Sequence, residues 1–510
     1  MSAQTHRLPI GGRIDRAKQV EILVDGHAIS AHPGDTVASA MLANGRIEVG
    51  NSLYRGRPRG VVAAGVEEPN ALLQVAGQCS ESMIPATTLS VVNALAVDTL
   101  SGLGRLAPDA DEAVYDKKYV HTDVLVIGAG PAGLAAALAA ARTGARVVLL
   151  DDQPEPGGSL LSGSQEQVDG APALNWVNSV IAELTTGAEV VVLPRTTAFG
   201  SYEDNYVLAV QHRTDHLDEA PAAVSRQRLW HIRATRVVIA TGAHERPLVF
   251  SGNDRPGVML ASAVRTYLNR YAVRAGTRVV VATTNDSAYD LVEDLLGHGI
   301  DVPVVIDARS DVSARAAACG APVVSGSVVV ATHGETRITS LEFSGLADSG
   351  ELTGEVETVQ CDALAVSGGW SPVVHLHSQR QGTIRWDEAL AAFVPDAPVS
   401  NQHVVGSAAG DFDLDSCLAA GWAAGGSDTA APRGGGGGLG TIRPVWLVPG
   451  VAGQPGSGTN TSSTCSATRR SPTCGARRVR ACEALNTSSA TPRSAPRTTR
   501  AKPRPSTPSV

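Results

Sequence analysis

Short apolar runs alternate with polar turns at the start of the chain. The stretch VEILVDGHAISAHPGDTVASAMLANG, residues 20–45, predicts two strands joined by a turn at Asp25-Gly26. A helix pattern follows, with Asp35 or Thr36 as its expected N-cap. More short strand patterns follow this helix, and residues 104–121 have the polar, Pro-containing character of a linker. We therefore expect a small ubiquitin- or ferredoxin-like domain over residues 1–115.

The next part of the chain alternates strand and helix patterns twice. The strand DVLVIG, an Ala-rich helix and the strand ARVVLLDD predict a βαβ unit after residue 122. Residues 277–306 repeat this order with TRVVVAT, a helix over 286–298 and DVPVVID. This repetition predicts two Rossmann-like halves, with the second inserted into the first. LAVSGGW at 364–370 is assigned to the return to the first half, so the expected first domain covers 116–250 and 364–430 and the inserted one 251–363.

Composition supports an α/β fold and removes several classes of function. Of 510 residues, 43% are hydrophobic and only 4% aromatic, which fits Ala/Val/Gly-rich packing. A net charge of −8 argues against nucleic acid as a partner. The N-terminus shows no apolar signal region and the longest apolar run is a glycine turn, so we expect no membrane partner. The seven cysteines form no C-x-x-C pair, which disfavours redox disulfide, zinc and cluster sites and fits a cytoplasmic protein.

The last eighty residues differ in character from the rest. Residues 431–510 contain twelve Lys and Arg against one Glu, a net charge of +11, which leaves −19 for residues 1–430. They are rich in Ser, Thr, Pro and Gly and show no periodicity, which predicts a disordered basic tail. The change is abrupt, and we hypothesise that a reading-frame shift near residue 430 produced it. Sequencing the DNA across codons 420–440 tests this, and an intact frame there would rule it out.

The segment VLVIGAGPAGLAAA contains the clearest chemical motif of the chain. Gly128, Gly130 and Gly133 fit G-x-G-x-x-G between a strand and a helix, where they permit a tight turn, close approach to a pyrophosphate and close helix packing. Asp151 follows Gly128 by 23 residues, at the end of the next strand, where a carboxylate can accept hydrogen bonds from ribose hydroxyls. Pro156-Gly157-Gly158, ATGAHERP and Gly410-Asp411 resemble further segments of two-domain flavoproteins of the glutathione reductase type. The predicted dinucleotide site comprises Gly128, Gly130, Pro131, Ala132, Gly133, Asp151, Asp152, Gly158 and Asp411, while Asp411 has the alternative of a turn or helix N-cap.

Two expected motifs are missing. TTNDS at 283–287 stands where the second half would need its glycines, so this half should not bind a second dinucleotide in the usual way. The loop NSLYRGRPRG stands where a plant-type [2Fe–2S] domain has its cysteines, and it has none. Its Arg55, Arg57 and Arg59 could meet an anionic ligand or partner, or form a solvated basic loop.

Candidate catalytic and metal-binding residues are few. His244, Glu245 and Arg246 form a possible acid/base trio, although a polar crossover near the nucleotide explains them better. His375 and His377 alternate as in a strand and lack a third ligand, so we expect no metal. The catalytic residues are unknown from sequence.

Taken together, the segments GDTVASAMLANG, NSLYRGRPRG, EEPNALLQV, GAGPAG, ATGAHERP, PGVMLASAVRTYLNRY, TTNDSAYD and GSAAGDFDLDSCLAAG resemble the α subunit of heterotetrameric sarcosine oxidase, from about residue 20 to 430. The resemblance implies a ferredoxin-like (β-grasp) domain without a cluster, followed by a glutathione-reductase-like fold with two Rossmann domains. It also implies an oxidoreductase that acts on CH–NH donors, with oxidative demethylation of sarcosine to glycine and with hydrogen peroxide and 5,10-methylenetetrahydrofolate as further products. In that family the α subunit holds NAD+, the β subunit holds FAD, and FMN lies at the α–β interface, with γ and δ subunits completing the complex.

Carried onto this chain, the resemblance gives NAD+ to the glycine turn and Asp151, with Asp411 nearby. The family continues into a folate-binding domain that residues 431–510 do not resemble, so folate binding is expected to be lost. One alternative is an FAD-binding subunit of a related amine or opine dehydrogenase. The other is a non-catalytic, nucleotide-binding scaffold subunit.

Overall fold

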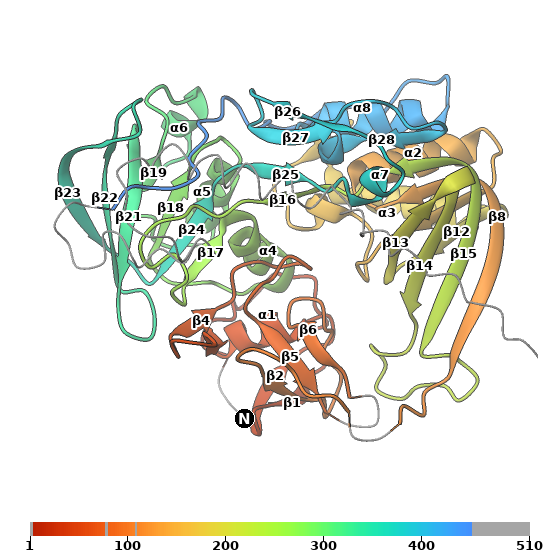
Figure 1. Ribbon diagram of the computed structural model, residues 1–510, viewed down its shortest axis with the longest axis horizontal. Coiled ribbons are helices and arrows are strands. Elements are labelled where there is room, and N and C mark those ends of the chain that lie inside the picture. The colour runs from red at the N-terminus through yellow and green to blue at the C-terminus, as the bar shows by residue number, and fades with distance from the viewer. Residues whose placement is uncertain (1–3, 77–79, 108–109, 451–510) are drawn as a thin grey trace, which may run out of the picture. The chain divides into compact units, whose positions relative to one another are not determined.

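The computed structural model describes residues 4–76, 80–107 and 110–450 (Figure 1). The N-terminal unit is a five-stranded sheet in the order β2-β1-β7-β5-β6. β1 and β2 form the expected hairpin, in which Asp25 and Gly26 both have positive φ angles. The strands are β1 (Val20–Val24), β2 (His27–Ala31), β5 (Leu72–Val75), β6 (Ser82–Pro85) and β7 (Ala96–Thr99), with the separate hairpin β3 (Glu48–Asn51) and β4 (Pro58–Gly60). The ferredoxin-like prediction is confirmed.

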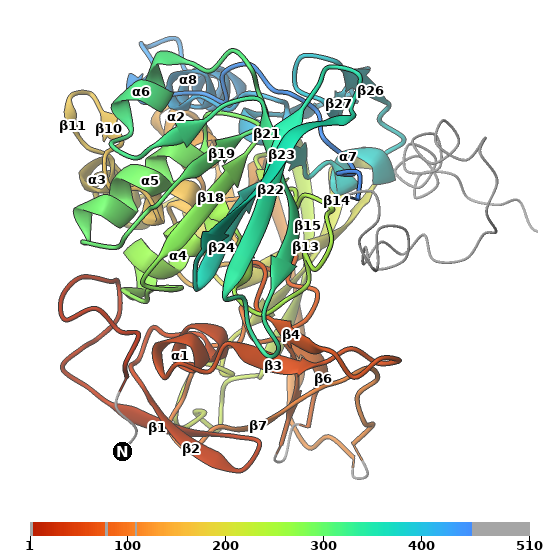
Figure 2. The ribbon, with the colours of Figure 1, turned by 90° about the vertical axis from the view of Figure 1, so that its left-hand side faces the viewer.

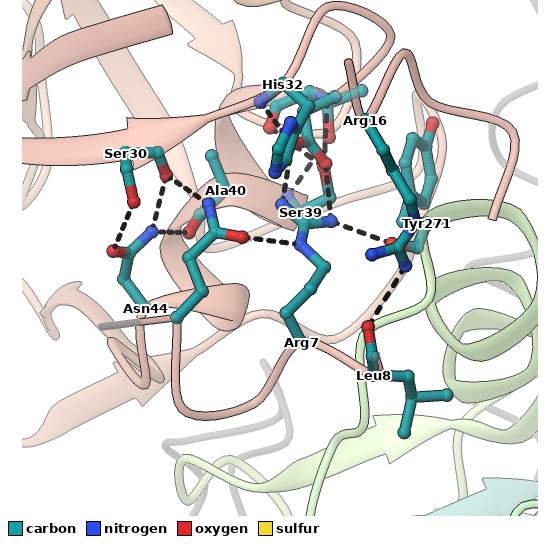
Figure 3. A network of polar contacts seen from close by, with 12 residues as sticks. Arg7, Leu8, Arg16, Ser30, His32, Ser39, Ala40, Asn44 and Tyr271 are labelled. Carbon is teal, nitrogen blue, oxygen red and sulfur yellow. Dashed lines mark hydrogen bonds and ion pairs between the residues drawn. The ribbon is translucent and has the colours of Figure 1, made fainter. Parts of the chain in front are cut away.

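Helix α1 (Val37–Ala43) is the core of this unit, since all seven of its residues are buried. Thr36 is its N-cap, and Thr36 and Ser39 exchange backbone-to-hydroxyl hydrogen bonds in a capping box. Asp35, the other expected N-cap, instead accepts hydrogen bonds from Arg7. The Arg7 guanidinium donates to both Asp35 oxygens, at 3.0 and 2.6 Å, and to the Tyr271 carbonyl at 2.7 Å (Figure 3). This ion pair is almost completely buried.

The first dinucleotide fold is built on a mixed sheet. Its order is β12-β9-β8-β15-β14-β13, and β28 also pairs with β15. Helices α2 (Pro131–Arg142), α3 (Ala173–Thr186) and α8 (Leu414–Gly425) share one apolar core with β8 and β9 (Figure 1). The strands are β8 (Tyr115–Ile127), β9 (Val147–Leu150), β12 (Val190–Leu193), β13 (Thr196–Tyr202), β14 (Tyr206–His212), β15 (Gln227–Ile239) and β28 (Gln402–Val404). β8 begins at Tyr115, inside the segment expected to be a linker, because it pairs with β15 along its length.

The second dinucleotide fold has a parallel sheet in the order β17-β24-β18-β19-β20. Helices α4 (Ala261–Tyr271) and α5 (Ala288–Gly297) pack with one part of it, and an antiparallel sheet of β21, β22 and β23 shares a separate core with it. The strands are β17 (Val258–Leu260), β18 (Val279–Thr283), β19 (Val305–Asp307), β20 (Val323–Val324), β21 (Ser327–His333), β22 (Ser340–Leu346), β23 (Leu352–Gln360) and β24 (Ala363–Ser367). The α/β fold class with two Rossmann-type units is confirmed.

One expected boundary differs. The sequence pattern places LAVSGGW in the first half, but β24 pairs with β17 and β18 of the second sheet. All five residues of β24 are buried, as is typical of an interior strand of a parallel sheet that is covered on both faces. The chain returns to the first half only after β24, through β25 (Trp370–Pro372), which pairs with β16 (Ala243–Glu245).

Residues 431–450 also differ from the expectation of a disordered tail beginning at 431. Leu439, Ile442, Val445 and Val448 are buried, and β29 (Gly434–Gly435) pairs with β10 (Gln167–Val168). The change in composition at residue 431 therefore does not mark the end of the folded chain. The rest of the predicted tail, 451–510, lies outside the described residues.

The remaining short elements lie between the elements already described. They are β11 (Ala171–Pro172), α6 (Ala314–Ala318), α7 (His375–Gln379), β26 (Ile384–Asp387) and β27 (Ala392–Pro395). Within the described ranges, no helix combines the length and the apolar character needed to cross a membrane.

Candidate dinucleotide-binding site

The glycine turn between β8 and α2 is closely packed, as the motif requires. Gly128 has a φ of +102°, and a Cβ there would overlap the carbonyl oxygen of Ala240 on the β15 side of the turn. A Cβ on Gly133 would overlap the carbonyl oxygen of Gly128. These two glycines therefore serve the turn itself, one by its backbone conformation and one by the close approach of the helix to the strand.

Gly130 has a different role, since it faces space rather than protein. Its φ is −73°, which any residue can adopt, and a Cβ there would meet only the Gly158 Cα, at 3.8 Å. It is the N-cap of α2 and provides no side-chain cap, and Pro131 occupies the first helical position. The first-turn amides of α2 thus lack a side-chain partner at the helix end that carries the positive dipole, which is the arrangement that holds a pyrophosphate. A dinucleotide fits this cradle.

Gly158 closes one side of the cradle. Its φ is +56°, and a Cβ on it would lie 2.7 Å from the Gly130 Cα. On another side, α8 packs tightly against α2, because a Cβ on Gly421 would overlap the carbonyl oxygen of Ala132. A Cβ on Gly406 would lie 2.8 Å from the Ala132 Cβ. The structure thus brings Pro131, Ala132 and Gly158 together around Gly130.

Asp151 follows β9 beside this turn. Its Oδ1 accepts the Gln153 backbone N–H at 2.8 Å, and its Oδ2 accepts the Ala129 backbone N–H. Burial raises the pKa of Asp151 to about 6, and the charge of Asp152 raises it further, against the two hydrogen bonds. The carboxylate is therefore tied to the glycine turn itself. Asp152 is exposed and accepts a 3.3 Å hydrogen bond from the Gln153 side chain.

Asp411 lies in the turn before α8. It is not the helix N-cap, because Asp413 accepts the Ser416 N–H at 2.8 Å and takes that role. Asp411 is half-buried, and burial together with Asp413 raises its pKa. Its backbone N–H donates to Gly406, whose contact with Ala132 connects this turn to the start of α2. Its predicted position near the dinucleotide remains a proposal.

The corresponding cleft of the second fold is filled by the chain itself. We call residues 436–448 the strap; it crosses the β18–α5 turn as the dark blue coil in Figure 1. The Asp286 N–H donates to the Leu439 carbonyl at 2.7 Å, and the Arg443 N–H donates to the Thr284 carbonyl at 3.1 Å. The strap therefore occupies the surface of the turn on which a second pyrophosphate would lie.

Side chains hold the strap at both sides of this turn. Arg309 pairs with Asp286 and Asp307, each at 2.7 Å, and donates to the Thr441 carbonyl at 2.8 Å. Asp307 ends β19, the position that corresponds to Asp151 in the first fold, and it is fully buried. Arg443 donates to the carbonyls of Ala308, Leu346 and Ala347. The missing glycines predict a non-standard second half. For the contacts of the strap, the place of Asp307 at the end of a strand is the one sequence signal available.

Two of the loop arginines already form ion pairs within the chain. Arg57 and Arg59 both form ion pairs with Asp254, which is largely buried. Their pairing within the chain corrects the expectation that all three arginines face an anionic ligand or water.

The trio His244, Glu245 and Arg246 is structural in its contacts. His244 pairs with Glu67 at 3.5 Å, and the Glu245 carboxylate accepts the Ser262 backbone N–H at 2.7 Å in the first turn of α4. Arg246 donates to the Ala391 carbonyl and lies over the Trp446 ring of the strap, and burial lowers its pKa to about 10. His375 and His377 lie on helix α7, not on a strand, and the buried His377 ring contacts Gln402 and Thr383. Among the described residues, no group of three or more candidate ligands could hold a metal ion.

Glu245 should make stability depend on pH. Burial raises its pKa from 4.5 to about 7, so the folded chain holds a proton that the unfolded chain releases between these values. We expect the free energy of unfolding to fall by about 3 kcal/mol from this group as the pH rises from about 4.5 to about 7. Urea unfolding at pH 5 and pH 7.5 should show a smaller fall in Glu245→Gln than in the wild type. An equal fall in the free energy of unfolding in the two proteins would show that Glu245 does not cause this pH dependence.

Comparisons with known proteins agree with this architecture. Residues 17–102 match the family described as a 2Fe-2S iron-sulfur cluster binding domain, and residues 123–240 match the FAD dependent oxidoreductase family. The chain is 52% identical over 478 residues to the α subunit of a sarcosine oxidase from Corynebacterium sp. (strain P-1), and the match covers 89% of this chain and 49% of that protein. The chain is a homologue of sarcosine oxidase α subunits. It spans about half the length of these curated relatives.

More distant similarities are to other amine-oxidising proteins by name. The A subunit of an opine oxidase from Rhizobium meliloti is 26% identical over 54% of this chain and 55% of that protein. The crystal structure of L-proline dehydrogenase from P. horikoshii matches with a TM-score of 0.60 at 22% identity, over 82% of this chain and 75% of that chain. At this identity the structural match supports the fold alone.

The iron–sulfur cluster of the first matched family does not fit this homologue of the α subunits. A [2Fe–2S] cluster of the plant type needs four cysteine ligands, and residues 17–102 contain one cysteine, Cys79. The domain therefore retains the fold without the donor set. No step of the chemistry is assigned to a cluster.

Proposed function

We propose that this chain is the dinucleotide-holding α-type subunit of a sarcosine oxidase. The observation that carries the proposal is the single open cradle at Gly130 among the described residues, in a chain 52% identical to sarcosine oxidase α subunits. The dinucleotide is NAD+, held by the α2 amides at its pyrophosphate and by Asp151 at its adenosine ribose. Bound NAD+ would supply a nicotinamide ring capable of hydride chemistry.

The complete reaction belongs to the assembled enzyme. We propose oxidative demethylation of sarcosine to glycine, with hydrogen peroxide formed by a complex that contains β, γ and δ subunits. Formation of 5,10-methylenetetrahydrofolate would require a folate-binding domain, which residues 431–510 do not resemble. The amine-oxidising flavin site would lie on the β subunit, and FMN would lie at the interface with it. The closed second cleft supports this division of roles, because the described part of this chain has one cradle for a dinucleotide and no second one facing it.

A second candidate differs in the cofactor. The match of residues 123–240 to FAD-dependent oxidoreductases, together with the similarity to the opine oxidase chain, favours FAD in the same cradle. This chain would then be the flavin-carrying subunit of an amine or opine oxidoreductase. The third candidate, a scaffold subunit whose nucleotide never turns over, predicts peroxide production that does not depend on an intact nucleotide site.

The nature of the bound nucleotide distinguishes the first two candidates. We expect the purified chain, after denaturation, to release NAD+ and no flavin, identified by absorbance and mass. Asp151→Asn should release much less, because an amide replaces the carboxylate that accepts the ribose hydroxyls. Release of FAD would instead support the second candidate, in which this chain is the flavin-carrying subunit. Equal retention by the wild type and Asp151→Asn would show that Asp151 is not a ligand.

A further inference from the structure

The end of β12 lies next to the position proposed for the adenosine ribose. In the sheet order β12-β9-β8, the glycine turn follows β8 and Asp151 follows β9. Leu150 pairs with Leu193, the last residue of β12, so these two strands end side by side. Ligands of such sheets lie outside the carboxyl ends of the strands. With the pyrophosphate at Gly130 and the ribose at Asp151, the adenine base is directed toward the turn of residues 194–196.

The backbone of this turn is fixed against the Asp151 loop. The Arg195 N–H donates to the Gln153 carbonyl at 3.0 Å, and the Thr196 N–H donates to the Asp151 carbonyl at 2.7 Å. The Arg195 carbonyl accepts the His212 N–H at 2.9 Å. Arg195 has a φ of +54°, a left-handed conformation that costs energy in residues other than glycine and is frequent at functional sites. Its backbone groups are engaged, so its side chain is the part available to a ligand.

The Arg195 guanidinium is half-buried and lacks an acidic partner. Its Nη1 donates to the Ser90 hydroxyl at 3.0 Å, and no carboxylate in the described part of the chain lies within ion-pair distance of it. Burial lowers the pKa of Arg195, the charge of Arg270 lowers it further, and Asp215 only partly opposes this. Buried charges in folded proteins are usually paired. This guanidinium is therefore suited to a partner that the chain itself does not supply.

Arg270 and the N-terminal unit border the same place. Helix α4 lies beside the N-terminal unit and shares its apolar core (Figure 2). Arg270, in the last turn of α4, donates to the Gln153 side chain at 3.2 Å and lies over the Tyr271 ring. Ser90 belongs to the N-terminal unit, between β6 and β7. Arg270 is thus held by contacts of its own, whereas Arg195 has its guanidinium largely to spare.

A second polar group near Arg195 has no partner among the described residues. The Nδ1 atom of His216 is buried and makes no hydrogen bond there. Burial lowers the pKa of His216, and the charge of Arg195 lowers it further, so the ring is neutral near pH 7. A neutral imidazole with an unused nitrogen suits the edge of a base, which carries both donors and acceptors, better than it suits an anion.

The charges around Arg195 also favour the base over a phosphate. Asp151 and the exposed Asp152 follow β9, and there a phosphate on the ribose 2′-oxygen would meet like charges. The adenine ring is neutral and offers an aromatic face on which a planar guanidinium stacks. The residues therefore fit a dinucleotide whose ribose carries no additional phosphate and whose base contacts Arg195.

We propose that Arg195 is an adenine-binding residue of this chain, whose guanidinium stacks on the base of the dinucleotide held at Gly130. The inference deepens the proposed function and rests on it, because it concerns the same site. It gives the adenosine half a second anchor at the end of β12, beside Asp151 at the end of β9.

The test measures nucleotide binding by the full chain, freed of nucleotide, in calorimetric titrations. The proteins are the wild type, Arg195→Met, Arg195→Lys and the control Arg233→Met, and the ligands are NAD+, NADP+ and ADP-ribose. Arg233 is exposed on β15 of the same sheet, with its guanidinium carbon 5.0 Å from the centre of the Tyr206 ring. Its loss removes the same charge from another part of that sheet.

We expect Arg195→Met to weaken the binding of NAD+ and of ADP-ribose equally, about 10-fold or more. Arg195→Lys should weaken both nearly as much, because an ammonium group has no planar face to stack. Arg233→Met should bind as the wild type does, and the wild type should bind NAD+ more tightly than NADP+.

Other results would overturn the inference and leave the proposed function intact. Unchanged NAD+ affinity in Arg195→Met is the first of these. Full affinity in Arg195→Lys is the second, since a point charge on a phosphate would then suffice. A loss with NAD+ but not with ADP-ribose, or a wild-type preference for NADP+ that Arg195→Met abolishes, would place Arg195 on another part of the nucleotide.

Failure of the wild type to bind NAD+ would overturn the proposed function instead. FAD has the same adenosine half, so titration of the same variants with FAD would then decide the inference by itself, and no binding of either nucleotide would overturn both. Equal thermal unfolding of the nucleotide-free wild type and Arg195→Met confirms that the variant is folded. If Arg195→Met unfolds at a lower temperature, Arg195→Lys decides.

Discussion

Gly130→Ala should abolish dinucleotide binding and leave the fold intact. The backbone at Gly130 permits alanine, and the nearest protein atom to the new methyl group is 3.8 Å away. That methyl group would occupy the space through which a pyrophosphate approaches the α2 amides. We expect affinity for NAD+ to fall about 100-fold or more, equivalent to about 3 kcal/mol, measured by calorimetric titration.

The matched control for this prediction is Gly297→Ala in α5. A Cβ on Gly297 would meet no atom within 4 Å, and this glycine lies in a helix of the other dinucleotide fold. We expect it to bind NAD+ as the wild type does. Retained binding in Gly130→Ala would show that the nucleotide does not lie on the start of α2. Loss of thermal stability in that variant would instead mean that the methyl group disturbs the Gly158 contact.

Asp35→Asn should cause the largest loss of stability among the single substitutions proposed here. The Asp35 carboxylate accepts two hydrogen bonds from Arg7, one from the Ser39 hydroxyl and one from the His32 N–H. Replacing it by an amide leaves the Arg7 guanidinium buried without its counter-charge. Breaking a buried pair in this way costs about 3–5 kcal/mol. Urea unfolding of the two proteins measures the difference.

A surface pair provides the control for Asp35. Glu183 and Arg142 form a bidentate pair on α3 and α2, and both side chains are about half exposed. Glu183→Gln should change the free energy of unfolding by less than about 1 kcal/mol, since solvent screens this pair. Similar losses of stability in Asp35→Asn and Glu183→Gln would show that burial does not decide how much the Arg7–Asp35 pair contributes to the free energy of unfolding.

Local sequence signals predicted the parts of this protein whose chemistry is local. The glycine turn, the Asp25-Gly26 hairpin and the cap at Thr36 each depend on residues a few positions apart, and the structure confirms all three. The assignment of LAVSGGW failed because a buried parallel strand has no period that says which sheet it joins. Pairing of Arg57 and Arg59 with Asp254 joins residues almost two hundred positions apart, and no local pattern announces it.

The glycine-rich run at 434–438 led to the wrong prediction that the disordered tail begins at residue 431, for a related reason. Glycine has no side chain that could show a period, so a folded segment and a disordered one have the same composition there. The packed positions after it, Leu439, Ile442, Val445 and Val448, become evident only with their partners. A frame shift at residue 430 would have to produce four fitting apolar side chains by chance, so the packing argues against a break at that point.

The strap acts as a permanent competitor for the second cleft. A segment of the same chain faces this surface at an effective concentration in the millimolar range or above, so a free nucleotide competes with it at a disadvantage. If the strap is closed about 1,000 times more often than open, a nucleotide that would bind the bare cleft at about 10 μM needs about 10 mM to bind half of the molecules. Within the described residues, changes in nucleotide supply would then act mainly through the Gly130 cradle.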